Sequence, residues 1–271
     1  MKFDPHDCTA IITGASSGLG AEFARQLAPK ARCLVLVARR LEALEEVKAE
    51  LLALKPGLVV HLVTADLGTE PGRAVLIDWV RQGPVKVNLL VNNAGLGDYG
   101  SLVEASIEKL RMQMEVNVTS VVLLTHALLP MLKGNAPAGI LNVSSLASTL
   151  PMPDLAVYAA SKAFVTSFSE GIAIELEPLG IQVTCVCPGP TPTNFSHTAR
   201  RPDGTDTNRE GQGILRVPKQ QVVSEALAAL GAGRTCVFPG LGVSIAGPLF
   251  RHLPRPLMRW FLRRRHASGK V

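Results

Sequence analysis

The sequence predicts an α/β protein whose single domain is built on a doubly wound, parallel β-sheet of about seven strands. Three observations support this fold class. The chain has 271 residues, of which 47% are hydrophobic and 18% are charged, so it can bury one large core. Short runs rich in Val, Ile and Leu alternate with longer segments of helical periodicity. No Pro/Gly-rich linker and no repeat divides the chain.

The predicted strands are near-continuous apolar runs, which are typical of parallel strands covered by helices on both faces. In order, they are residues 8–13, 32–38, 59–65, 87–92, 139–144, 181–187 and 234–238. The predicted helices are residues 18–29, 40–54, 71–82, 106–133, 155–178 and 218–231. A helix follows each of the first six strands, as parallel pairing requires.

Two segments fall outside this alternation. Residues 194–217 are polar, charged and contain glycine, so we expect them to form a mobile loop beside the substrate. Residues 241–271 are punctuated by Pro and Gly and then become strongly basic. We therefore assign residues 1–240 to one domain and residues 241–271 to a C-terminal tail.

The net charge of +6 comes from this tail. Residues 251–271 hold seven of the 28 Lys and Arg residues and none of the 22 Asp and Glu residues, which leaves 21 basic against 22 acidic residues elsewhere. A near-neutral body with only 4% aromatic residues argues against a nucleic-acid-binding protein.

The cysteines and the N-terminus indicate where the protein works. The five cysteines lie in or beside apolar runs without zinc-like spacing, so we predict reduced thiols and no metal site. The N-terminal sequence MKFDPHD lacks the basic start and apolar stretch of a signal peptide. No run of about 18 uncharged apolar residues predicts a membrane-spanning helix. We therefore expect a cytoplasmic protein.

The first predicted strand runs directly into a glycine-rich turn. It ends in Thr13-Gly14-Ala15-Ser16-Ser17-Gly18-Leu19-Gly20, and a helix follows. Gly14 allows the tight turn, Gly18 lets backbone amides approach a pyrophosphate, and Gly20 lets the helix pack closely on the strand. The loop, including Ser16, Ser17 and Leu19, is therefore predicted to bind a dinucleotide on a Rossmann-type fold.

This octapeptide resembles the cofactor loop of the short-chain dehydrogenases/reductases, in their single-domain, ketoreductase-like form. The resemblance covers about residues 8–240, which it identifies as an NAD(P)-binding catalytic domain with strand order 3-2-1-4-5-6-7. It also implies a homodimer or homotetramer built on helices 106–133 and 155–178. Further cofactor contacts are implied at Asp66, Leu67, Asn93, Ala94, Gly95, Pro188, Gly189, Thr191 and Thr193.

The same resemblance implies a catalytic tetrad of Asn117, Ser145, Tyr158 and Lys162, in which Tyr158 and Lys162 also contact the cofactor. The chemistry of these side chains agrees. Tyr158 and Lys162 are four residues apart, so they share one face of a predicted helix. We expect the ammonium to lower the phenol pKa from its usual value near 10, so that Tyr158 transfers the proton. Ser145 would stabilise the developing alkoxide, and Asn117 would hold a water linking Lys162 to solvent.

The end of the second strand predicts the choice of cofactor. Enzymes that use NAD(H) usually place Asp or Glu there to bind the ribose 2′-hydroxyl. This chain has Arg39 and Arg40, and no carboxylate before Glu42. A guanidinium suits a 2′-phosphate, so the sequence favours NADP(H) over NAD(H). One departure is that many NADP-preferring relatives carry a basic residue where this chain has Ser17.

The residues around the predicted tetrad are apolar and predict a hydrophobic ketone, aldehyde or alcohol as substrate. They are Leu96, Leu146, Leu150, Pro151, Met152 and Pro190. No Arg, Lys or His stands at these positions to bind a substrate carboxylate, although ordinary loop packing explains each residue equally well. We predict an NADP(H)-dependent oxidoreductase. The alternatives are a catalytically idle cofactor sensor and a membrane-surface interaction protein.

The basic tail carries the membrane alternative. Arg251, Arg255, Arg259 and Arg263 recur every four residues, and an apolar set lies roughly opposite on a helix: Leu253, Leu257, Trp260 and Phe261. Pro254 and Pro256 restrict the predicted helix to residues 257–265. Two interpretations remain open. The apolar face packs on the protein or a neighbouring subunit, or it contacts an anionic membrane, which would place the protein at the inner membrane surface.

Overall fold

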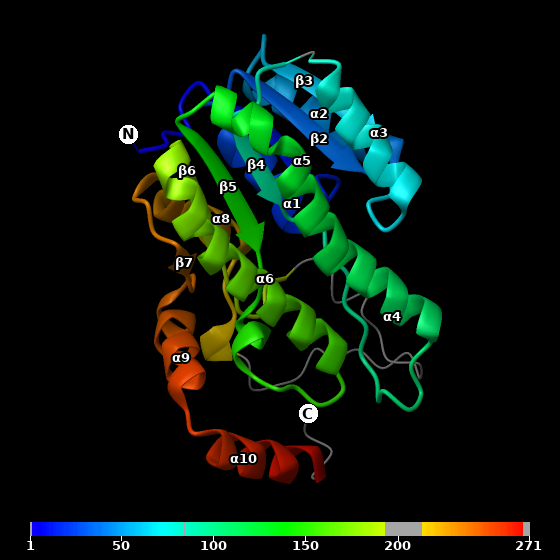
Figure 1. Cartoon of the computed structure of the whole chain (residues 1–271), viewed down its shortest axis with the longest axis vertical. Helices are drawn as coiled ribbons and strands as arrows, with labels where there is room; N and C mark the ends of the chain where they lie inside the picture. The colour runs from blue at the N-terminus through cyan, green and yellow to red at the C-terminus, as the bar shows by residue number, and fades with distance from the viewer. Residues whose placement is uncertain (1, 84, 193–212, 268–271) are drawn as a thin grey trace.

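A seven-stranded parallel sheet forms the centre of the protein (Figure 1). The computed structural model describes residues 2–83, 85–192 and 213–267, with side chains up to residue 264. The strands lie in the order β3-β2-β1-β4-β5-β6-β7, which confirms the expected topology. Their bounds are β1 Thr9–Thr13, β2 Cys33–Ala38, β3 Val59–Thr64, β4 Leu89–Asn92, β5 Ala138–Val143, β6 Ile181–Val186 and β7 Cys236–Val237. The last strand is shorter than the predicted 234–238.

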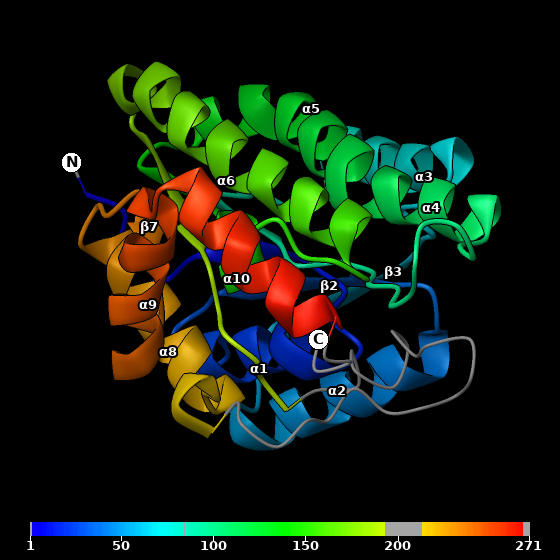
Figure 2. The ribbon, with the colours of Figure 1, turned by 90° about the horizontal axis from the view of Figure 1, so that it is seen from below.

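Helices cover both faces of the sheet, as the apolar strands require (Figure 2). One layer contains α1 (Gly18–Leu27), α2 (Leu41–Leu54) and α8 (Lys219–Gly231). The other contains α3 (Glu70–Arg81), α4 (Ile107–Met114), α5 (Ser120–Gly134) and α6 (Ala156–Leu176). Two separate hydrophobic clusters result, one around Phe23 and Leu44 and the other around Leu76, Leu124 and Leu128.

The predicted helix over residues 106–133 is interrupted. A π-helical turn at Glu115–Thr119 joins α4 to α5, and Asn117 lies within it. The wider turn leaves the usual backbone hydrogen-bond pattern, and the Ser120 hydroxyl donates to the Val116 carbonyl at 2.6 Å. Such turns occur often at functional sites. The turn places Asn117 against the sheet edge, where its side chain is fully buried.

This long helical stretch is also apolar. Among the described residues, Ile107–Gly134 is the one helix whose length and composition would allow it to cross a membrane. Its side chains Leu124, Leu128 and Leu132 are fully buried against the sheet. The core of the domain therefore explains the apolar side chains on one face of the helix, while others, such as Leu123, stay exposed.

The tail forms two helices rather than one short one. They are α9 (Leu241–His252) and α10 (Arg255–Ala267), with Pro254 between them. Pro256 lies in the first turn of α10, where proline is tolerated, so the helix is longer than the predicted 257–265. The side chain of Val243 in α9 is fully buried in the core. The boundary at residue 240 stays a prediction, although α9 packs on the domain.

The apolar face of α10 is largely uncovered by the described part of the chain. Leu257, Trp260 and Phe261 are each about half exposed, at 53%, 53% and 52%. Met258 is buried, so one side of α10 is covered. Figure 1 shows α10 on the side toward which the strands point.

Candidate active site

The glycine-rich turn leaves the N-terminus of α1 open. The helix begins at Gly18, and its N-cap residue Ser17 makes no side-chain cap hydrogen bond. Gly14 and Gly18 have φ values of 64° and 58°, a region that favours glycine. A Cβ on Gly20 would collide with the Gly14 carbonyl and lie 2.6 Å from Asn93 Nδ2. Each glycine therefore has a steric reason, and the first-turn N–H groups can donate hydrogen bonds to an anionic ligand.

A hydrogen-bond network joins this turn to the end of β4. Asn93 Nδ2 donates to the backbone oxygens of Thr13 and Gly14 at 2.8 and 3.3 Å. Thr13 Oγ1 accepts from the backbone N–H groups of Asn93 and Ala94 at 2.9 and 3.0 Å. Sequence reasoning assigned no role to Thr13, although a hydroxyl immediately before the glycine turn was a visible signal. The network fixes the spacing between the two strand ends.

The predicted adenosine end lies beside β2 and β3. Arg39 follows the last residue of β2, is exposed, and makes no hydrogen bond or ion pair with another described residue. Asp66 Oδ1 accepts from the Gly68 N–H at 3.0 Å, which shapes the turn after β3. Leu67 is buried. Within the described part of the chain, nothing therefore competes with a ligand for Arg39 at the carboxyl edge of the sheet.

The Asn117 side chain both accepts a hydrogen bond from the Leu96 backbone and donates one to it. Its Oδ1 accepts from the Leu96 N–H at 2.8 Å, and its Nδ2 donates to the Leu96 carbonyl at 2.8 Å and to Ser161 Oγ at 3.0 Å. Gln113 Nε2 donates to the same carbonyl at 3.3 Å. The side chain of Asn117 therefore positions the loop after Gly95, and its predicted contact with a water stays a prediction.

Ser145, Tyr158 and Lys162 meet where β5 ends and α6 begins. The side chains of Ser145 and Tyr158 are hydrogen-bonded to each other. Lys162 Nζ donates to the Val143 carbonyl at 2.9 Å and lies 5.8 Å from the centroid of the Tyr158 ring. A Cβ on Gly95 would lie 3.3 Å from Lys162 Nζ. The structure thus brings together the side chains predicted for the tetrad.

The pKa values in this cluster differ from the expectation. Burial raises the pKa of Tyr158 to about 12, and the hydrogen bond with Ser145 only partly opposes this. Burial lowers the pKa of Lys162 from 10.5 to about 8. The predicted lowering of the Tyr158 pKa by Lys162 is therefore wrong for this structure: burial raises the pKa, the lowering comes from the Ser145 hydrogen bond, and the Lys162 ammonium is directed to the Val143 carbonyl.

The loop after β6 holds the remaining predicted cofactor residues. Pro188 is buried, and its carbonyl accepts from the Leu146 N–H at 2.8 Å. Gly189 packs so closely on Leu215 and Val243 that a Cβ would not fit. Thr191 Oγ1 donates to the Gly189 carbonyl at 3.0 Å. Thr193 and residues 194–212 of the predicted substrate loop lie outside the described residues.

Apolar side chains surround the tetrad only in part. Leu96, Leu150 and Met152 are partly exposed, as lining residues must be, whereas Leu146 is a core residue at 7% exposure. Sequence reasoning missed Tyr99, which lies close enough to Tyr158 to raise its pKa further. A backbone hydrogen bond of 2.9 Å from Gly100 to Asp154 joins the two loops that carry these residues.

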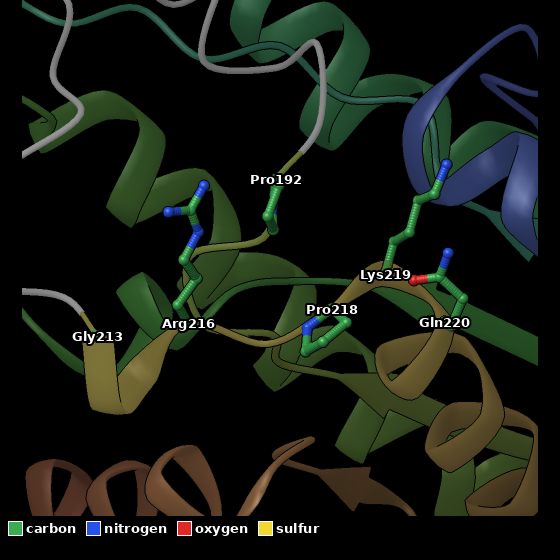
Figure 3. A pocket seen from close by; sticks show the side chains of 6 residues that line it. All are labelled: Pro192, Gly213, Arg216, Pro218, Lys219 and Gln220. Atoms are coloured by element: carbon green, nitrogen blue, oxygen red, sulfur yellow. The ribbon is translucent and has the colours of Figure 1, made fainter.

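A cavity of about 400 Å³ lies beyond the loop after β6 (Figure 3). It is lined by Pro192, Gly213, Arg216, Pro218, Lys219 and Gln220, and none of the tetrad contributes. Within the described ranges, no group of three or more His, Cys, Asp or Glu side chains is arranged to hold a metal ion. The five cysteines are free thiols, and four of them are buried.

Comparison with known proteins agrees with this geometry. The profile of the short chain dehydrogenase family matches residues 8–204. Dehydrogenase/reductase SDR family member 7B of Bos taurus is 35% identical over 241 residues, which cover 85% of this chain and 73% of the relative. Sulfoacetaldehyde reductase of Chromohalobacter salexigens is 38% identical over 192 residues, covering 70% of this chain and 74% of the relative.

A solved structure supports the same assignment. The short-chain dehydrogenase from Sphingobium yanoikuyae, in complex with NADPH, superposes with a TM-score of 0.78 at 27% identity, covering 97% of this chain and 96% of the other. The family profile spans the glycine turn, the NNAG segment and the tetrad. Sequence, fold and site therefore agree that this chain belongs to the short-chain dehydrogenase/reductase family.

Proposed function

We propose that the protein is an NADP(H)-dependent oxidoreductase that interconverts a hydrophobic ketone or aldehyde and the corresponding alcohol by hydride transfer. The observation that carries this proposal is the hydrogen-bonded pair of Tyr158 and Ser145 beside the buried Lys162. These three side chains lie at the same edge of the sheet as the open N-terminus of α1. A dinucleotide bound at that helix would reach them along the carboxyl ends of the strands.

The residues present fit a dinucleotide. The first-turn N–H groups of α1 are uncapped and suit phosphate oxygens. A Cβ on Gly14 would lie 2.9 Å from the Ala94 Cα, so the turn must be bare for the two loops to approach. Lys162 would bond the nicotinamide ribose hydroxyls. When bound, the nicotinamide supplies or accepts the hydride.

The protein itself supplies the proton of the reaction, through Tyr158. In the reductive direction Tyr158 donates its phenolic proton to the carbonyl oxygen of the substrate, and Ser145 donates a hydrogen bond to the same oxygen. The proton on Tyr158 is then replaced from solvent through Lys162, whose pKa of about 8 lies close to neutrality. In the oxidative direction the steps reverse.

Arg39 is the proposed contact for the 2′-phosphate of NADP(H). It is exposed beyond β2 and has no competing partner among the described residues. A planar guanidinium donates two parallel hydrogen bonds to a phosphate, which a carboxylate at this position would repel. The NADPH held by the Sphingobium yanoikuyae relative supports the same choice of cofactor.

Arg39→Asp should therefore shift the preference from NADP(H) toward NAD(H). The new carboxylate repels a 2′-phosphate and accepts a hydrogen bond from a free ribose 2′-hydroxyl. We expect the ratio of kcat/KM for NADPH over NADH to fall by about 10²-fold, the size of losing one charged bidentate contact. A ratio that stays at the wild-type value would move the phosphate contact to Ser16, Ser17 or Arg40.

A hydrophobic substrate is supported by the partly exposed Leu96, Leu150 and Met152, in loops that flank the tetrad in sequence, and by Tyr99, which lies near Tyr158. The test is NADPH consumption with a panel of aryl, steroid and acyl carbonyls, set against sulfoacetaldehyde as a short, anionic aldehyde. Turnover of the apolar compounds alone supports the proposal. Turnover of sulfoacetaldehyde alone contradicts the hydrophobic class, and NADPH binding without any turnover favours the idle cofactor sensor.

The assembly is proposed to be a homodimer or homotetramer built on the α4–α5 and α6 helices. Their outer faces carry exposed apolar side chains, including Leu123 at 44%, Phe164 at 41% and Ile174 at 76%. Phe164 and Phe168 stack with ring centroids 5.9 Å apart, which makes a flat aromatic surface on α6. Apolar faces of this kind are typical of contacts between subunits.

The protein is proposed to be cytoplasmic, and its tail is proposed to contact an anionic membrane surface through α10. Its half-exposed Leu257, Trp260 and Phe261 lie beside exposed arginines, and Arg264 stacks on the Trp260 ring at 4.5 Å. An aromatic, apolar face flanked by cations is typical of an interfacial helix. Such contact would bring the site, on the same side of the molecule as α10, to apolar substrates (Figure 1).

Full-length protein should therefore co-sediment with anionic vesicles at low salt, and added salt should weaken the binding. A chain ending at Leu253 keeps the packed helix α9 and should stay in the supernatant. The triple variant Leu257→Ser, Trp260→Ser, Phe261→Ser keeps every arginine and separates apolar insertion from charge. Full-length protein that remains unbound at low salt would leave packing against another subunit as the explanation of the exposed face.

A further inference from the structure

We propose that Arg73 is a positioning residue that holds the adenine-binding segment of the site against the π-helical turn carrying Asn117; this inference rests on the proposed use of a dinucleotide. Arg73 lies in α3, one turn after the segment Asp66–Thr69 that follows β3. Its Nη1 donates to the Leu67 carbonyl at 3.0 Å and to Glu115 Oε2 at 2.8 Å. The Arg73 guanidinium therefore bonds both the segment after β3 and the π-helical turn.

The segment after β3 has little support of its own. It is an irregular turn whose internal bonds run from the Gly68 N–H to Asp66 Oδ1 and from Thr69 to the Asp66 carbonyl. The Leu67 side chain is buried in the core, and its carbonyl accepts from Arg73. The guanidinium therefore fixes the backbone orientation at Leu67, where the adenine ring is expected.

The other partner of Arg73, Glu115, lies in the π-helical turn that carries the tetrad residue Asn117. Glu115 is the first residue of the π-helical turn, and Asn117 follows two residues later. The segment after β3 also packs tightly on α4 and the π-helical turn, since a Cβ on Gly68 would collide with Met112 Sδ and lie 3.1 Å from Val116 Cγ2. The Arg73–Glu115 bond thus adds a polar contact to the side-chain packing between these two segments.

The burial of Arg73 argues for a positional role rather than a simple gain in stability. The side chain is only 9% exposed, while that of Glu115 is 42% exposed. Nε of Arg73 is buried without a partner among the described residues. A buried guanidinium with an unsatisfied donor is costly to keep, and an apolar side chain of similar size often stabilises such a position better. The fixed geometry of the fork explains why an arginine is used here.

The test compares Arg73→Leu with Arg81→Leu, which makes the same change in the same helix. Arg81 is exposed and pairs with Asp78 at 3.4 Å, away from the site. Affinities of the full-length variants are measured by fluorescence titration with NADPH and by competition with 2′,5′-ADP, which carries the adenine half alone. Arg73→Leu should weaken both by about tenfold, with kcat at saturating NADPH within about twofold of wild type.

Two further variants keep the inference falsifiable if Arg73→Leu folds poorly. Arg73→Lys retains a cation that can reach one partner and should recover part of the affinity. Glu115→Gln retains an acceptor oxygen and should weaken 2′,5′-ADP binding less than Arg73→Leu does. Wild-type affinity for 2′,5′-ADP in folded Arg73→Leu, or an equal loss in Arg81→Leu, overturns the inference. Wild-type protein that binds no dinucleotide instead overturns the proposed function.

Discussion

Replacing Tyr158 with Phe is expected to lower kcat by about 10²–10⁴-fold while leaving NADPH affinity close to that of wild type. The size is that of removing a positioned proton donor. The hydroxyl lost is the one hydrogen-bonded to Ser145, whereas the open N-terminus of α1 that would hold the dinucleotide is untouched. Single-turnover reduction of an active carbonyl, with a separate NADPH titration, measures both quantities.

The chain offers a matched control, because Tyr99 is its other tyrosine. Tyr99 lies near Tyr158 but in the loop before α4, and Tyr99→Phe makes the same chemical change. We expect it to alter kcat by less than about tenfold. Comparable turnover in Tyr158→Phe and wild type would remove the acid–base role from Tyr158, and a larger loss in Tyr99→Phe would transfer that role to Tyr99.

Lys162→Met should abolish most activity and also change how stability depends on pH. The variant loses the proposed contact with the nicotinamide ribose and the proton path to Tyr158, so kcat/KM should fall by at least about 10²-fold. At pH 7 its free energy of unfolding should lie close to that of wild type. Burial of the ammonium costs roughly 3 kcal/mol for a pKa lowered from 10.5 to about 8, and the lost hydrogen bond to Val143 opposes this with about 1–3 kcal/mol.

The pH dependence separates these two contributions. Between pH 8 and 10.5 the unfolded chain holds a proton on Lys162 that the folded chain releases, so this group makes wild-type stability rise with pH. The free energy of unfolding of wild type minus that of Lys162→Met should therefore increase by roughly 3 kcal/mol across this window and stay flat below it. Titrations of Tyr158 and the cysteines largely cancel in the difference.

Urea unfolding of both proteins at intervals from pH 7 to 11 measures this difference. A difference that does not change with pH would mean that Lys162 keeps its ordinary pKa in the folded protein. Arg39→Asp serves as a comparison, because its side chain is exposed and its loss should leave the pH profile unchanged in this range.

The fold was predictable because the core is built on short strands made almost entirely of apolar residues. Every residue of β1, β2 and β5 is buried, so these strands consist mostly of apolar residues and are easy to recognise in the sequence. The details that sequence reasoning missed depend on tertiary contacts. The π-helical turn at Glu115–Thr119 has no local signal and is accompanied by bonds to Leu96 and Arg73 from other parts of the chain.

The site was predictable in its residues but only partly in its chemistry. Glycine spacing and the Tyr-x-x-x-Lys pattern located the groups that the structure brings together, because both patterns depend on local geometry. The direction of the Tyr158 pKa was not predictable, since burial is a property of the whole fold. The bonds from Thr13 to Asn93 and from Arg73 to Glu115, and the effect of Tyr99 on Tyr158, were missed for the same reason: each joins distant segments of the chain.

The double hydrogen bond between Asn117 and Leu96 has a consequence for how substrate range could evolve. The backbone of the loop after β4 is clamped at Leu96, and the residues that follow, up to the start of α4, hold no part of the tetrad. Insertions or exchanges beyond Leu96 can therefore reshape the mouth of the site while Asn117, Ser161 and Lys162 keep their places. Variation in this loop therefore leaves the clamped side chains in place, and among the residues beyond Leu96 it is Tyr99 that links the loop to proton transfer, through the pKa of Tyr158.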